Sequence, residues 1–107
     1  MNVRKITFII IVSALLLSAC GSQALPPAVT AAQKAVANTL GLQQDKVVVG
    51  SYEVKEWPNS CMGAAKEGEM CAQVITNGYK VTMRAQTDGK YYVAHTNQDG
   101  SLIRILP

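Results

Sequence analysis

The chain has 107 residues, of which 49% are hydrophobic, and its formal net charge at pH 7 is +3. This length accommodates one small domain and excludes two. A basic nucleic-acid-binding protein is disfavoured because ten Lys and Arg residues are offset by seven Asp and Glu residues, and the single histidine leaves few combinations for a multi-residue active site.

The first 19 residues have the composition of an export signal. Arg4 and Lys5 precede an apolar run over residues 6–17, which is shorter than an ordinary membrane-spanning helix. Without residues 1–19, eight basic and seven acidic residues remain, so the formal charge of the remaining chain is +1. We therefore predict a signal peptide over residues 1–19, which carries most of the apparent basicity.

The export signal ends in the quartet Leu17-Ser18-Ala19-Cys20, which is followed by Gly21. The order of positive charge, apolar run and quartet resembles the lipobox of bacterial lipoprotein precursors. The resemblance implies that Cys20 carries a diacylglycerol and becomes the mature N-terminus. The protein is then anchored in the cell membrane or outer membrane and faces the periplasm or the extracellular space. An uncleaved anchor helix, or secretion with an incidental cysteine, is the alternative.

A lipidated tether over residues 20–27 leads into a single predicted domain over residues 28–107. Pro26-Pro27 stiffens the end of the tether and suits the entrance of a helix. Residues 28–40 are rich in alanine, and Gly41 stands where a helix C-cap glycine is expected. The apolar residues recur at helical spacing and predict a helix with one apolar stripe: Val29, Ala32, Val36 and Leu40.

The residues from Lys46 to Trp57 predict the first strand, because they are β-branched and then alternate between apolar and charged. Pro58 ends this strand, since proline cannot donate to a β-ladder. A loop is predicted over residues 60–70, closed by two cysteines.

Cys61 and Cys71 form an even pair once Cys20 is assigned to lipid, and an even pair in an oxidising compartment predicts a disulfide. Closing this short loop contributes about 3 kcal/mol on the chain-entropy estimate. A metal pair or a redox-active couple is the alternative, but the spacing is not Cys-x-x-Cys and no second pair or nearby histidine completes a zinc site. No metal site and no cofactor are predicted.

Three turn dipeptides lie 11 residues apart: Asn77-Gly78, Asp88-Gly89 and Asp99-Gly100. Such dipeptides favour tight hairpins between antiparallel strands, so strands are expected over residues 71–76, 79–86, 90–96 and 101–106. The predicted fold class is α+β. One N-terminal helix packs on a four- to five-stranded antiparallel meander, stapled by one disulfide, and the other face of the sheet is partly exposed to water.

A helix followed by an antiparallel meander resembles cystatin-like folds and the PepSY or β-lactamase-inhibitor type of small envelope domain. Residues 91–103 are similar to the terminal PepSY hairpin, with aromatic residues, a turn with Asp and Gly, and a last strand. Trp57-Pro58-Asn59-Ser60-Cys61 and Gly68-Glu69-Met70-Cys71 resemble a group of small exported bacterial proteins with a two-cysteine loop. This second resemblance brings no catalytic residues to the chain.

The loop closed by the cysteines is the candidate binding site, because a pre-rigidified loop loses less entropy on binding. Its candidate contact residues are Trp57, Met62, Lys66, Glu67, Glu69 and Met70. The alternative is a purely structural connection with Trp57 packed over the sheet edge. His95 is expected to be a half-exposed strand residue without a catalytic partner. The tyrosines on neighbouring strands form a candidate aromatic surface: Tyr79, Tyr91 and Tyr92.

The predicted function is that of a non-enzymatic, lipid-anchored envelope module that binds a protein, peptide or wall component through the loop. One alternative is a protease-inhibitor-like lipoprotein with Lys66 or Met62 as its specificity residue. Another is a structural or assembly role in which a sheet edge pairs with a partner strand. The predicted partners are the membrane, through the lipid, and a protein or peptide. No nucleic acid is expected, and the oligomeric state stays open.

Overall fold

The computed structural model of the protein describes residues 24–107. The predicted signal peptide over 1–19 and residues 20–23 of the predicted tether, which include the lipidation site Cys20, lie outside the described residues. Within residues 24–107, no helix is long and apolar enough to cross a membrane. The elements in chain order are α2 (Pro27–Leu40), the 3₁₀ helix η1 (Gln44–Lys46), β1 (Val47–Trp57), β2 (Thr76–Ala85), β3 (Tyr91–Asn97) and β4 (Ile103–Ile105).

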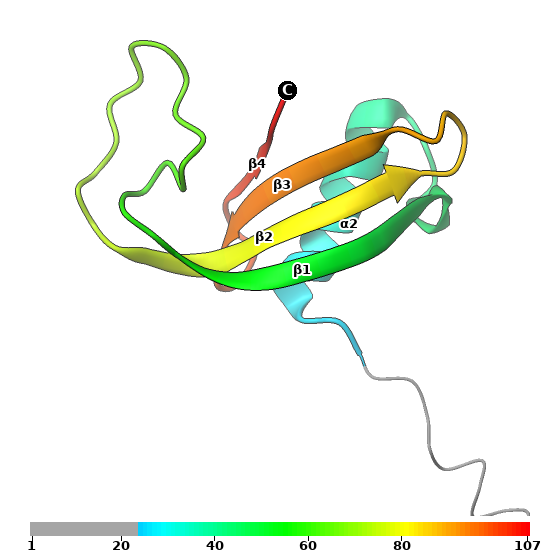
Figure 1. Ribbon diagram of the computed structural model, residues 1–107, viewed down its shortest axis with the longest axis horizontal. Coiled ribbons are helices and arrows are strands. Elements are labelled where there is room, and N and C mark those ends of the chain that lie inside the picture. The colour runs from blue at the N-terminus through cyan, green and yellow to red at the C-terminus, as the bar shows by residue number, and fades with distance from the viewer. Residues whose placement is uncertain (1–23) are drawn as a thin grey trace, which may run out of the picture.

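One helix packs on a four-stranded antiparallel sheet with the strand order β1-β2-β3-β4, which confirms the predicted fold class (Figure 1). Neighbours in sequence are neighbours in the sheet, as expected for a meander. β1 carries a bulge between Val49 and Ser51, which shifts the register of its second half against β2. Because β1 and β4 are the outermost strands in this order, they are the two edge strands.

The helix α2 ends where its sequence predicts and begins one residue before the predicted range of 28–40. It starts at Pro27, and Gly41 ends it in the left-handed conformation with a φ of 70°. The backbone N–H of Leu42 donates to the carbonyl of Ala37 and satisfies one of the last helical acceptors. Small side chains on the buried face let the helix lie close to the sheet. The core between the two layers comprises Val29, Ala32, Val36, Ala37, Val47, Val81, Met83 and Ala94.

The Asn77-Gly78 dipeptide is not a turn, and the prediction of a strand over residues 71–76 is wrong. β2 begins at Thr76, and Gly78 lies inside it, paired with Lys55 of β1 and Asn97 of β3. A Cβ atom on residue 78 would lie 1.7 Å from the carbonyl oxygen of Thr96. Glycine is therefore required here for the close approach of β3 and not for a hairpin.

The other two turn dipeptides lie at the predicted hairpins. Gly89 and Gly100 both adopt a positive φ, of 69° and 78°. In each turn the carboxylate of the aspartate before the glycine accepts a hydrogen bond from a backbone N–H. The donor is Lys90 for Asp88 and Ser101 for Asp99, and the bond stabilises the turn.

Candidate functional site

The segment over residues 58–75, here called the disulfide loop, covers part of the sheet face opposite α2. Cys61 and Cys71 form the predicted disulfide, with their Cα atoms 5.5 Å apart. Two hydrogen bonds between Ser60 and Ala72 close the neck of the loop next to the disulfide. The chain itself therefore covers part of the face that is predicted to be partly exposed to water, whereas Glu53 and Arg84 on this face remain exposed.

Trp57, His95 and Met62 attach the loop to the sheet. The Trp57 and His95 rings stack with a centroid distance of 4.2 Å and an interplanar angle of 23°. Trp57 Nε1 donates to the carbonyl of Thr96 at 3.0 Å, and His95 Nδ1 lies 2.7 Å from the carbonyl of Met62. Because a carbonyl only accepts, this geometry places the proton of a neutral His95 on Nδ1.

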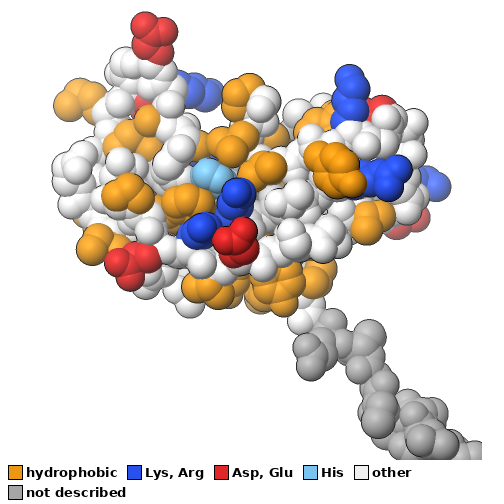
Figure 2. Space-filling view, viewed as in Figure 1, with side chains coloured by type: hydrophobic (Ala, Val, Ile, Leu, Met, Phe, Trp, Pro, Cys, Tyr) orange, Lys and Arg blue, Asp and Glu red, His pale blue; other side chains and the backbone are white. Residues whose placement is uncertain are grey.

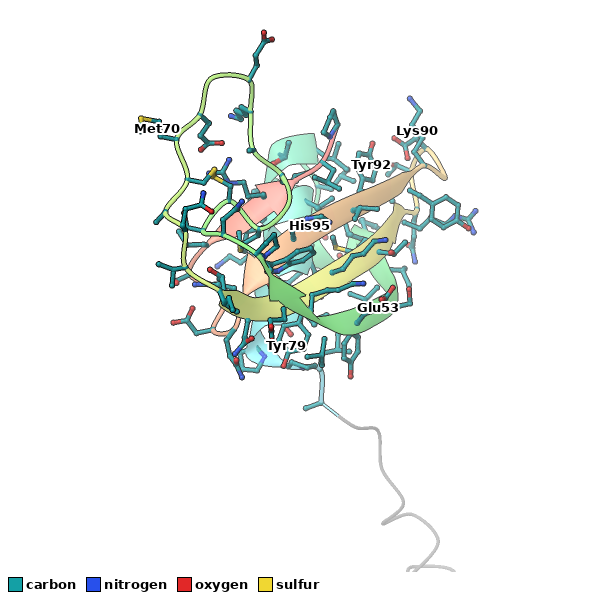
Figure 3. All side chains as sticks on the ribbon, turned by 60° about the vertical axis from the view of Figure 1, so that its left-hand side comes forward. Glu53, Met70, Tyr79, Lys90, Tyr92 and His95 are labelled. Atoms are coloured by element: carbon teal, nitrogen blue, oxygen red, sulfur yellow. A yellow bond between two sulfur atoms is a disulfide. The ribbon has the colours of Figure 1, made fainter. Side chains whose placement is uncertain are left out.

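These contacts correct three expectations about single residues. His95 is 8% exposed and not half-exposed, because the Trp57 ring and the loop cover it. Trp57 is equally buried, and it lies over the face of the sheet and not over its edge. Met62 is fully buried, so it does not lie on the surface of the loop. Figure 3 shows His95 on β3 beneath the disulfide loop.

Arg104 of β4 and Glu69 of the loop form a second attachment. Both terminal nitrogens of the guanidinium donate to the carboxylate of Glu69, and one of them also reaches the carbonyl of Ala64 at 3.4 Å. The Arg104 hydrogen bonds and the backbone N–H of Lys66 lower the pKa of Glu69 from 4.5 to about 2. The same carboxylate raises the pKa of Arg104. At neutral pH the ion pair between Glu69 and Arg104 therefore holds the loop against β4.

The Glu69 ion pair is expected to make the stability of the domain depend on pH in the acidic range. The pKa of Glu69 is about 2 in the folded state and 4.5 in its ordinary state, so the unfolded chain takes up the proton first as the pH falls. The contribution of the pair is present above about pH 4.5 and is lost between there and about pH 2. Urea unfolding of the native chain and of Glu69→Gln should therefore differ most above about pH 5.

Glu67→Gln is the matched control for this experiment, because Glu67 lies in the same loop and is exposed. Its stability difference from the native chain is expected to be small and nearly constant with pH. A Glu69→Gln difference that stays equal from about pH 6 down to about pH 2 would contradict a stabilising role of the pair.

The outer surface of the loop is formed by other residues. Lys66, Glu67 and Met70 are exposed, and the Met70 side chain, 97% exposed, lies on the outer side of the loop (Figure 3). Val74 and Ile75 are also exposed, although the sequence places them in a strand. Of the two specificity residues considered for an inhibitor, only Lys66 is accessible.

A pocket of about 510 Å³ lies between the disulfide loop and β4. Its loop wall contains Ala64, Ala65, Lys66 and Glu69, and its sheet wall contains Ile103, Arg104, Ile105 and Pro107. A second pocket of about 330 Å³ has walls from α2, the start of β3 and the end of the described chain, and it is lined mostly by apolar side chains such as Val36, Leu40, Tyr92 and Leu106. Ile105 and Pro107 line both pockets, which therefore meet at the end of β4.

The remaining candidate groups do not form a site together. Tyr79 packs edge-on against Tyr52 of β1, with ring centroids 6.2 Å apart, whereas the hydroxyl of Tyr92 donates to Asp88. The predicted aromatic surface is thus divided between two parts of the sheet. In the part of the chain that the structure describes, no three His, Cys, Asp or Glu side chains are grouped so that they could hold a metal ion.

A family model with the description "Domain of unknown function (DUF8738)" matches residues 29–105. The chain belongs to this family. No curated protein and no solved structure gives a significant match. The DUF8738 match begins inside α2 and ends at the last residue of β4, so it includes the sheet, the disulfide loop and most of the residues that line the two pockets beside β4.

Proposed function

We propose that this DUF8738 protein is a lipid-anchored, non-enzymatic module of the cell envelope that binds an extended protein or peptide segment along the outer edge of β4, beside the disulfide loop. The observation that carries the proposal is the edge of β4, which has a pocket on each face of the sheet. Support for the membrane anchor is the Leu17-Ser18-Ala19-Cys20 quartet after the apolar run.

The outer edge of β4 offers backbone hydrogen bonds to a new strand. The N–H of Leu106 donates to Val93 of β3, and the carbonyl of Leu102 accepts from Asn97 of β3. Because backbone groups alternate in direction along a strand, Ile103 and Ile105 turn theirs away from β3. No strand within residues 24–107 pairs with this edge. A peptide that adds here obtains its affinity from main-chain bonds and its specificity from the pockets.

The two pockets differ in chemistry and therefore define a peptide class. Successive side chains of an added strand point to opposite faces of the sheet. The helix-side pocket is lined by residues such as Val36 and Leu40 and favours a large apolar side chain. In the loop-side pocket Arg104 is neutralised by Glu69, whereas the side-chain ammonium of Lys66 has no carboxylate within 4.0 Å among the described residues. We expect an acidic side chain at this position, next to the apolar one.

A selection from a random peptide library on the full-length acylated protein in detergent tests this proposal. We expect enrichment of peptides with an apolar residue next to an acidic residue. Lys66→Glu should exchange the acidic preference for a basic one, because it reverses the charge in the loop-side pocket. Glu67→Lys is the matched control, since Glu67 does not line either pocket, and it should leave the preference unchanged.

The anchor is tested separately from the peptide site. Cys20→Ser is expected to move the protein out of the membrane fraction, while the peptide preference of the domain stays the same. Selection of the same peptides by the native chain and Lys66→Glu, or no enrichment at all, would overturn the binding proposal. Retention of Cys20→Ser in the membrane fraction would overturn the lipid anchor alone.

A further inference from the structure

The opposite edge of the sheet, formed by β1, is long and exposed. β1 extends over 11 residues and is the first strand in the sheet order, so its outer edge has no partner strand among residues 24–107 (Figure 1). Val54 at the middle of its second half is 78% exposed. Edge strands of this length are usually shortened, covered or charged, because they pair readily with other strands.

The direction of the backbone groups on β1 follows from the hydrogen bonds of β2. The N–H of Ala85 donates to Lys90 on the β3 side. By alternation Lys80 turns its backbone groups toward β1, where the register pairs it with Glu53. The residues between the bonded ones must then direct their N–H and C=O groups away from the sheet. In the second half of β1 these residues are Tyr52, Val54 and Glu56.

The side chains around Val54 are complementary to themselves. Glu53 and Lys55 lie on the same sheet face and form an ion pair at 3.2 Å. Two antiparallel copies of this strand with their two-fold axis at Val54 place Glu53 of each copy opposite Lys55 of the other. An axis at Glu53 places two acidic residues opposite each other, and an axis at Lys55 places two basic residues opposite each other. Only the register centred on Val54 pairs both charges.

We propose that β1 pairs antiparallel with β1 of a second copy of this chain about a two-fold axis at Val54, which joins the two sheets into one. Each Val54 then exchanges backbone hydrogen bonds with its counterpart. The adjacent Glu53–Lys55 pairs occupy the non-hydrogen-bonded positions, where facing side chains are closest. The two Val54 side chains lie on the sheet face opposite Glu53 and Lys55, where they contact each other and shield each other from water. Such a contact is isologous and closes as a dimer.

Basic and acidic side chains lie next to each other on the surface beside the β1 edge, as the space-filling view shows (Figure 2). In the dimer the two intrachain pairs become one cluster of four alternating charges across the axis. Reversing one charge places like charges opposite each other in both halves, which is destabilising. This pairing does not involve the disulfide loop or β4, so it goes beyond the proposed peptide site and can succeed or fail independently of it.

Sedimentation equilibrium of the full-length protein in density-matched detergent tests the pairing. The native chain is expected to show a monomer–dimer equilibrium over concentrations up to about 1 mM, because pairing through one strand edge buries a small area. Glu53→Lys alone and Lys55→Glu alone should each weaken self-association at least about tenfold, since like charges directly opposite each other oppose strand pairing. Glu67→Lys, which makes the same charge change in the loop, should leave the equilibrium unchanged.

Mixing the two single variants tests the register itself. A Glu53→Lys copy has two basic residues beside Val54, and a Lys55→Glu copy has two acidic ones, so the mixture should form a heterodimer that neither variant forms alone. A native chain that stays monomeric, single variants that dimerise like the native chain, or a mixture that stays monomeric would each overturn the proposal.

Discussion

Gly78→Ala is expected to destabilise the domain by at least about 3 kcal/mol, which is the upper end of the usual range for overpacking a close-packed site. The added Cβ would lie 1.7 Å from the carbonyl oxygen of Thr96 and 2.9 Å from Cα of Asn97. Both contacts are backbone, so no side-chain rotation relieves them, and β3 must move away from β2. That movement also disturbs the acceptor of the Trp57 indole bond.

Gly50→Ala is the matched control in the neighbouring strand. Its Cβ would lie 3.5 Å from the carbonyl oxygen of Thr82, which is an ordinary van der Waals distance. We expect its unfolding free energy to remain within about 0.5 kcal/mol of the native value, as for most exposed substitutions. Urea unfolding followed by far-UV circular dichroism measures both variants. Equal unfolding midpoints for Gly78→Ala and Gly50→Ala would show that the close approach of β3 does not require glycine.

The helix and two of the three predicted hairpins were predictable because they depend on neighbouring residues. The apolar stripe of α2 and its terminal Gly41 lie within one segment. The Asp-Gly turns are stabilised by hydrogen bonds from the backbone N–H two residues after each aspartate to the aspartate side chain. Gly78 marks the limit of such reasoning. Glycine is found both where the backbone needs a positive φ and where another backbone approaches closely. The residues around a glycine do not show which of the two applies.

The attachments of the disulfide loop were not predictable, because each joins residues far apart in the chain. The Trp57 indole bond to Thr96 spans 39 residues, and the Glu69–Arg104 pair spans 35. Hydrophobic periodicity places Trp57 and His95 on strands, but it does not give the register that brings their rings together. The burial of Met62 likewise depends on how the loop folds back. Of the six candidate contact residues, Trp57 and Met62 are therefore buried and the other four are exposed.

Trp57→Ala is expected to cost about 3–5 kcal/mol, the range for removing a large buried aromatic side chain. The indole is 8% exposed, stacks on His95, lies beside Gly63 of the loop and donates to the Thr96 carbonyl. Its removal leaves a cavity and an unsatisfied acceptor between the loop and the sheet. Urea unfolding followed by far-UV circular dichroism is suitable, because the variant lacks the only tryptophan of the chain. Tyr91→Ala, which removes a 70% exposed ring, is the control and should change stability by about 0.5 kcal/mol or less.

Trp57→Phe separates the two contributions of the indole. Phenylalanine keeps an aromatic ring over His95 but lacks the donor to Thr96, so its cost should be nearer 1 kcal/mol, the usual net value of one hydrogen bond. Loop attachment has its own measurement in the rate of trypsin cleavage after the exposed Lys66 of the native disulfide loop. Cleavage should be fastest in Trp57→Ala and close to native in Trp57→Phe. If Trp57→Ala and Tyr91→Ala unfold at the same urea concentration and are cleaved at the same rate, the disulfide and the Arg104–Glu69 pair hold the loop without the indole.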